Sequence, residues 1–118
     1  MTQQPLVRGE VVIDGRVPPF DNGTIHVLLE EIPAADAAAR VVGSVAVPQV
    51  GHDAAATETS VPFAISADVA IDEGCEYRVR VWVDRDSRGH EGPGDLYSDE
   101  AYPVLTRGAG TTVRVILD

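Results

Sequence analysis

The residues most suited to binding a metal ion form the loop DRDSRGHEGPGD, which runs from Asp84 to Asp95. Acids occupy its first, third and twelfth positions, and a glycine occupies its sixth. Calcium takes six or more hard oxygen ligands, and a twelve-residue loop supplies them at alternate positions as it wraps the ion. His90 stands where such a loop offers a backbone carbonyl. The spacing therefore makes Asp84, Asp86, His90 and Asp95 a candidate calcium site.

Three features of the same loop argue for a simpler interpretation. Arg88 occupies the fifth position, where an oxygen ligand is needed, and the last acid is the shorter Asp. The loop also contains Pro93 and follows a strand-like segment, unlike a helix–loop–helix hand. The alternative is an acidic turn in which Asp84 and Asp86 accept hydrogen bonds from backbone N–H groups. The sequence favours the turn and leaves calcium as the competing hypothesis.

A second candidate site lies on the strand that precedes this loop. Arg78, Arg80 and Trp82 alternate with apolar residues, so they share the face opposite the core, and Tyr97 can line the same surface. Arginine and aromatic side chains on an exposed sheet are suited to stacking on a partner. In the alternative interpretation, Trp82 covers the rim of the core and the arginine stems lie over apolar surface.

Catalytic groups are sparse. Cys75 is the only cysteine, which excludes an intrachain disulfide and indicates a small residue near a strand start. The three histidines do not have the spacing of a zinc site. A hydrolase would require His90, Asp84 and Asp99 to meet within hydrogen-bond reach. The expectation is that the chain is not an enzyme.

The charge and composition limit the kinds of partner that the chain is expected to bind. The 118 residues carry 19 acids and 9 bases, all arginine, for a formal charge of −10. Such a surface repels phosphates, so a nucleic-acid partner is not expected. The N-terminus lacks a basic segment followed by an apolar run, a lipobox cysteine is absent, and no stretch of about 20 apolar residues occurs. The sequence predicts a cytoplasmic protein without membrane insertion.

Alternating apolar residues predict the strands that must position these groups. The pattern recurs in about seven segments separated by turns, with little helical sequence. This spacing predicts a single domain over residues 1–118, an all-β, antiparallel two-layer sandwich of the immunoglobulin-like or transthyretin-like Greek-key type. The residues expected to point inward are Val11, Ile13, Ile25, Val27, Leu29, Val41, Val45, Val47, Phe63, Ile65, Tyr77, Val79, Val81, Val83, Val113, Val115 and Leu117.

Local signals refine this plan. Asn22-Gly23 predicts a hairpin between the first two strands, because Asn-Gly tolerates positive φ. Gly43 marks a bulge or a close approach of backbone. The alanine-rich residues 33–40 are expected to form one or two helical turns at most. Pro62 indicates an edge strand, since proline lacks the N–H of a central ladder.

Three segments together resemble the YbaY/YscW-type lipoprotein domain. They are IHVLLEEIPAADAAARVVGSVAVP (25–48), VPFAISADVAIDEGCEYRVRVWVDRDSRG (61–89) and LYSDEAYPVLTRGAGTTVRVIL (96–117). The resemblance covers roughly residues 8–117 and includes no catalytic signature. It implies a β-sandwich of the kind found in envelope lipoproteins, among them pilotins, which bind and escort secretin subunits.

The residues and the resemblance together predict a protein-binding or assembly module, whose partner is another protein or a second copy of the chain. Recognition would use a sheet face or an exposed edge strand. A calcium-stabilised domain is the first alternative and an unrecognised hydrolase the second. Apart from calcium, no cofactor is expected.

Overall fold

The computed structural model of the chain describes residues 6–33, 38–53, 58–67, 70–85, 96–98, 102–106 and 108–118. Regular structure in these ranges is entirely β. None of it is a helix with the length and apolar character that crossing a membrane demands. The strands are β1 (Val7–Asp14), β2 (Phe20–Ile32), β3 (Arg40–His52), β4 (Glu58–Ile65), β5 (Glu76–Asp84), β6 (Leu96–Tyr97), β7 (Tyr102–Val104) and β8 (Thr112–Leu117).

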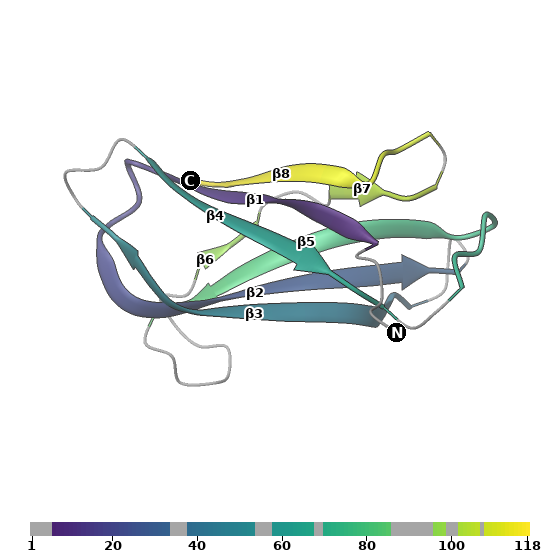
Figure 1. Ribbon diagram of the computed structural model, residues 1–118, viewed down its shortest axis with the longest axis horizontal. Coiled ribbons are helices and arrows are strands. Elements are labelled where there is room, and N and C mark those ends of the chain that lie inside the picture. Colours follow the sequence, from purple (N-terminus) through teal and green to yellow (C-terminus); the bar gives the residue numbers. More distant parts are fainter. Residues whose placement is uncertain are drawn as a thin grey trace.

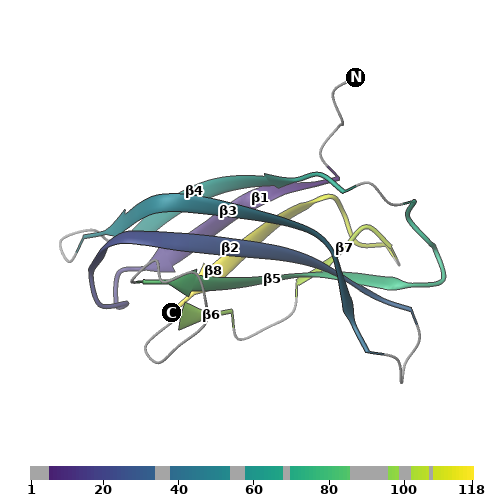
Figure 2. The ribbon, with the colours of Figure 1, turned by 90° about the horizontal axis from the view of Figure 1, so that it is seen from below.

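The strands form two sheets that lie one over the other (Figure 1). The three-stranded sheet has the order β4-β1-β8, and the five-stranded sheet has the order β3-β2-β5-β6. The short β6 and β7 pair with opposite ends of β5, and β6 lies beside the last residues of that strand (Figure 2). Every pairing is antiparallel except that of β1 with β8. The predicted all-β two-layer sandwich is therefore confirmed, with one parallel pair added.

Alternation along the strands builds the core, as predicted. The inward residues of β2 and β5 are buried, among them Ile25, Leu29, Tyr77 and Val81. They meet apolar side chains of the three-stranded sheet in one hydrophobic cluster. Burying such side chains contributes about 1.5–3 kcal/mol each relative to leaving them exposed. Valine dominates this cluster because its branched side chain suits a pleated surface.

The predicted hairpin between the first two strands is wrong. β1 belongs to the three-stranded sheet and β2 to the five-stranded sheet, so the segment between them crosses the sandwich. Asn22 does have positive φ, at 55°, but it lies inside β2. There the β2–β3 register shifts between Phe20 and Gly23. The conformational tolerance of Asn-Gly therefore serves a strand irregularity and not the turn.

Gly43 marks both a bulge and a close approach, as predicted. The β2–β3 register shifts between Leu29 and Glu30, opposite this glycine. A Cβ atom at position 43 would lie 3.0 Å from a methyl carbon of Ile65 in β4. The shift reverses the alternation, so Val41, which was expected to point inward, is 53% exposed. That expectation is wrong because the register skips Val42, so side chains on the two sides of this extra residue no longer alternate in phase.

Two further predictions concern β4 and the alanine-rich segment. β4 carries Pro62 and lies at an edge of the three-stranded sheet, as expected. Positions 34–37, half of the segment predicted to form helical turns, lie outside the described residues, and the last residue of that segment, Arg40, begins β3.

A polar network closes one end of the sandwich. The Tyr77 hydroxyl donates to Oε2 of Glu31 over 2.6 Å and accepts the N–H of Asp72 over 3.0 Å. Arg40 binds the other carboxylate oxygen, with its Nη2 atom 2.7 Å away. Glu31 is buried, so these hydrogen bonds compensate for the water that its charge loses. The network anchors the end of β2 to β5.

Candidate binding face

The outer face of the five-stranded sheet gathers aromatic and arginine side chains from three strands. We call it the aromatic–arginine face, and it consists of His26 and Glu30 of β2, Arg78, Arg80 and Trp82 of β5, and Tyr97 of β6. The β2–β5 register sets His26 opposite Trp82, and the β5–β6 register sets Trp82 opposite Tyr97. Strand pairing therefore lines up three aromatic rings across the sheet.

The three rings are stacked. The imidazole of His26 lies nearly parallel to the indole of Trp82, with centroids 4.1 Å apart and planes inclined by 9°. The ring of Tyr97 follows on the other side, with its centroid 6.5 Å from that of Trp82. Trp82 is half-buried and Tyr97 is 42% exposed. The stack holds the indole in one orientation while leaving aromatic surface open to solvent.

Two arginines share one carboxylate beside this stack. Arg78 donates from Nε to Glu30 over 2.8 Å, and Arg80 donates from Nη1 to the second oxygen over 3.3 Å. Glu30 is buried, and in the described residues no other carboxylate pairs with these arginines. Among the described residues of this face, two positive groups on one negative group leave a surplus of one positive charge. This contrasts with the formal charge of −10 on the whole chain.

The structure brings the predicted partner-binding residues together. Arg78, Arg80 and Trp82 share one face of β5, and Tyr97 stacks on the last of them. Trp82 is not among the partly buried residues that pack on the core. The sequence did not identify His26 and Glu30 as members of this face. His26 was placed on the outward side of its strand, but only the strand register shows that it meets Trp82.

The outer face of the three-stranded sheet has a different character. Arg114 pairs with Glu10 at 3.0 Å and approaches Glu58 at 3.9 Å, and Ser60 donates to Glu10. These groups form an exposed network in which acids outnumber the base. Exposed ion pairs of this kind contribute little and are typical of a solvated face. Ile116, 43% exposed, is the large apolar residue there.

Cys75 does not resemble a nucleophile. It is buried just before β5, and the Thr106 hydroxyl donates to its backbone carbonyl over 2.7 Å. Burial, with a further contribution from the charge of Asp72, raises the pKa of the Cys75 thiol. A protonated thiol is a poor nucleophile, which fits the predicted structural role.

The predicted calcium loop is only partly described. Asp84 is the last residue of β5, pairs with Thr24 and is fully buried. Asp86, His90 and Asp95, like Asp99 of the hydrolase hypothesis, lie outside the described residues. The part of the chain that the structure describes contains no group of three or more metal-ligating side chains. The calcium site remains a prediction.

A thermal melt tests the calcium hypothesis. A ligand that binds only the folded state raises the free energy of unfolding by RT ln(1 + [L]/Kd). Calcium bound by Asp84 and its neighbours should therefore raise the melting midpoint in millimolar calcium above that in chelator. Magnesium at the same concentration controls for ionic strength. Equal midpoints in calcium and chelator would reject the site.

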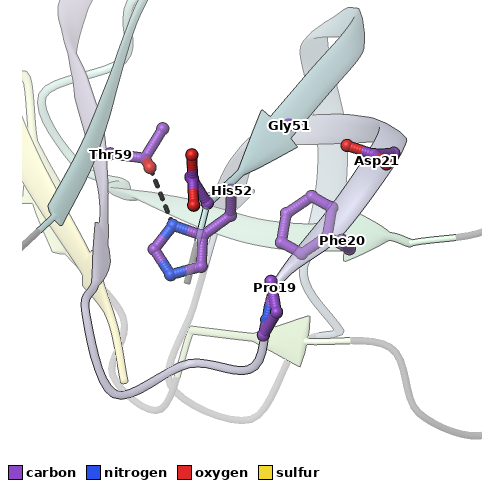
Figure 3. A pocket seen from close by; sticks show the side chains of 7 residues that line it. Pro19, Phe20, Asp21, Gly51, His52 and Thr59 are labelled. Carbon is purple, nitrogen blue, oxygen red and sulfur yellow. Dashed lines mark hydrogen bonds between the residues drawn. The ribbon is translucent and has the colours of Figure 1, made fainter. Parts of the chain in front are cut away.

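A hollow of about 650 Å³ lies where β2 begins and β3 ends, lined by Pro19, Phe20, Asp21, Gly51, His52, Asp53 and Thr59. Figure 3 shows the imidazole of His52 with Nδ1 directed to Thr59. That nitrogen lies 2.7 Å from the threonine hydroxyl, and the Phe20 ring is tilted against the imidazole at 6.0 Å. Nε2 of His52 is enclosed, without a hydrogen-bond partner among the described residues. The ring is thus packed inside the protein and not presented to a ligand in the hollow.

Comparisons with known proteins agree with the fold and with the resemblance seen in the sequence. The model of a family described as type III secretion system lipoprotein chaperone (YscW) matches residues 2–117. No curated protein matches the chain. Among solved structures, an alternative pilotin from the type II secretion system of Vibrio cholerae is similar, with a TM-score of 0.69 and 23% identity. The alignment covers 98% of this chain and 96% of that chain, and shows a shared fold. Since the family model spans nearly the whole sequence, the chain belongs to the YscW family of type III secretion lipoprotein chaperones.

Proposed function

We propose that the chain is a protein-binding module whose partner docks on the aromatic–arginine face. The observation that carries this proposal is the stack of His26, Trp82 and Tyr97 next to two arginines on an exposed sheet. The proposed activity is recognition, because Trp, Tyr and Arg are the residue types that most often anchor protein interfaces. Membership of a chaperone family supports a protein as the ligand.

The composition of this face fits an interface. Trp, Tyr and Arg supply most of the binding energy in protein interfaces, and they act best where they are already ordered. Trp82 is held between two rings, and both arginines are oriented by Glu30. A partner that covers the face therefore loses little side-chain entropy from the chain. The solvated ion pairs on the opposite sheet offer no comparable anchor.

The proposed partner is a subunit of a secretion channel of the secretin class. The support is the family description and the pilotin with the same fold. The test uses purified soluble fragments of the secretins encoded in the same genome, titrated against the chain. The experiment also includes sedimentation of the chain alone, because a second copy is the competing occupant of the face.

Replacing Tyr97 by alanine should weaken binding of the secretin fragment about 30-fold, the effect of losing an interface anchor of about 2 kcal/mol. Calorimetric titration measures the change. The matched control is Ile116→Ala, because Ile116 is as exposed as Tyr97, at 43% and 42%, but lies on the other sheet. This variant should bind like the wild type.

Two outcomes would contradict the proposal. Equal losses in Tyr97→Ala and Ile116→Ala would place the interface elsewhere. Binding of no secretin fragment, together with self-association that Tyr97→Ala abolishes, would assign the face to a second copy of the chain.

A further inference from the structure

We infer that the segment bound by the aromatic–arginine face carries a carboxylate next to an aromatic or large apolar side chain. This inference rests on the proposed function and adds the chemistry of the partner. The carboxylate binds at Arg78 and Arg80, and the apolar group covers Trp82 and Tyr97.

The charge balance points to a carboxylate. Glu30 neutralises one of the two guanidinium groups in the described part of this face, so one positive charge remains. Arg80 is half exposed, with 49% of its side chain accessible, and it donates to Glu30 through one nitrogen at 3.3 Å. A guanidinium has five N–H donors in a planar fork that fits a carboxylate. A second carboxylate thus completes the cluster without displacing the first.

The spacing of the strand places an apolar group next to that carboxylate. Arg80 and Trp82 are two residues apart on β5, which separates them by roughly 7 Å along the sheet surface. The Tyr97 ring extends the aromatic surface across to β6. In a bound peptide, side chains separated by about 7 Å are two residues apart if the peptide is extended and three or four apart if it is helical.

The charge of the whole chain restricts the partner further. A formal charge of −10 repels polyanions such as nucleic acids and strongly acidic peptides. A segment with a single acid among neutral or basic residues satisfies the local surplus and avoids this repulsion. The face is therefore selective for an isolated acid next to an aromatic residue.

Selection from a random peptide library displayed on phage tests the inference without a known partner. Peptides enriched on the immobilised chain should contain Asp or Glu two to four residues from Trp, Tyr or Phe. Trp82 is the only tryptophan of the chain, so its fluorescence reports the binding of a selected peptide that itself contains no tryptophan. Replacing the acid of that peptide by its amide should weaken binding about tenfold.

A variant of the chain tests the same contact from the other side. Arg80→Gln leaves Arg78 to neutralise Glu30, so the fold should persist while the surplus charge is lost. Binding of the selected peptide should weaken about tenfold. Arg114→Gln is the matched control, because Arg114 is 55% exposed and also paired with a glutamate, but lies on the other sheet. It should bind like the wild type.

The outcomes separate this inference from the proposed function. Enriched peptides without acids, no enriched peptide, or full binding by Arg80→Gln would overturn the inference. If Tyr97→Ala still bound the secretin fragment more weakly than the wild type does, the proposed function would stand. Acidic–aromatic peptides that lose affinity in Arg80→Gln, with no secretin fragment bound, would support the inference and reject the proposed partner. If the Arg80→Gln variant does not fold, the acid-to-amide change in the peptide still tests the carboxylate contact on the wild-type chain.

Discussion

Replacing Gly9 by alanine is expected to lower the free energy of unfolding by about 3 kcal/mol or more, the upper range for overpacking a well-packed site. A Cβ atom at this position would lie 1.9 Å from the backbone carbonyl oxygen of Val113 and 3.1 Å from the Phe63 ring. Real Cβ contacts are never so short. The first contact is with backbone, so a side-chain rotation cannot relieve it.

The position of Gly9 in the fold makes the clash costly. It lies in the central strand of the three-stranded sheet, paired with Phe63 of β4 and with Val113 of β8. Any side chain must push β1 and β8 apart, and this is the parallel pair that holds the C-terminal strand to the sheet. A loss of about 3 kcal/mol should lower the melting midpoint by roughly 10 °C in a domain of this size.

Gly51→Ala is the matched control. Gly51 also lies in a strand, but a Cβ atom there would be 3.7 Å from its nearest neighbour, which is ordinary contact. This variant should melt within a few degrees of the wild type, since alanine also reduces the freedom of the unfolded chain. Circular dichroism during heating measures both variants. A Gly9→Ala protein that melts like Gly51→Ala would contradict the close approach of β1 and β8.

The side-chain alternation that builds the sandwich could be predicted from the sequence because each strand carries its own signal. Tyr77, Val79, Val81 and Val83 are all buried, as their period-two spacing requires. The same alternation placed Arg78, Arg80 and Trp82 on the outer face. A pattern of this kind depends only on backbone geometry, so it can be recognised without knowing which strands are neighbours.

Strand pairing could not be predicted in the same way. Asn22-Gly23 has the local preference of a hairpin turn, yet it forms an irregularity within β2, because the crossover to the second sheet comes earlier. The inserted residue near Gly43 reversed the orientation of Val41. Both errors come from the choice of partner strand, which depends on contacts between residues distant in the sequence.

The members of the candidate site also divide into those that alternation predicts and those that depend on strand pairing. The β5 members of the aromatic–arginine face follow from alternation, whereas His26 and Glu30 join them only through the β2–β5 register. Burial of Glu30 is unexpected for a residue on an outer face, and its two arginine partners explain it. A buried acid between two outward arginines is therefore a signal that could be sought once the register is known.

The polar network around Glu31 makes stability depend on pH. The hydrogen bond from Tyr77, followed by that from Arg40, lowers the pKa of the Glu31 carboxyl below its usual value of 4.5, although burial opposes this. Burial raises the pKa of Tyr77, so its hydroxyl remains a donor at neutral pH. Below pH 4.5 the unfolded chain takes up a proton at Glu31 more readily than the folded chain. The contribution of the network is thus complete above pH 4.5 and is lost as pH falls through the folded pKa.

Tyr77→Phe should lower the free energy of unfolding by about 2 kcal/mol at pH 7, the range for a hydrogen bond to a charged group. Among the described residues, the buried carboxylate then keeps only Arg40 as a side-chain partner, and the side chain of Arg40 is 68% exposed and screened by solvent. The loss should shrink as pH is lowered below 4.5, since protonation of Glu31 removes the charge that Tyr77 stabilises. Denaturant titrations of the wild type and the variant at pH 7 and pH 3 measure this difference, in which the other acids cancel.

Tyr102→Phe separates the charge effect from the loss of a hydroxyl group. The Tyr102 hydroxyl accepts the backbone N–H of Ile116 over 3.2 Å, so its contact involves no carboxylate. Its loss should destabilise the protein by about 1 kcal/mol, equally at both pH values. If the loss of stability in Tyr77→Phe were also independent of pH, the Tyr77 hydroxyl would not be stabilising the charged form of Glu31. The end of the sandwich would then be held by packing, with Tyr77 acting as a buried ring in the core.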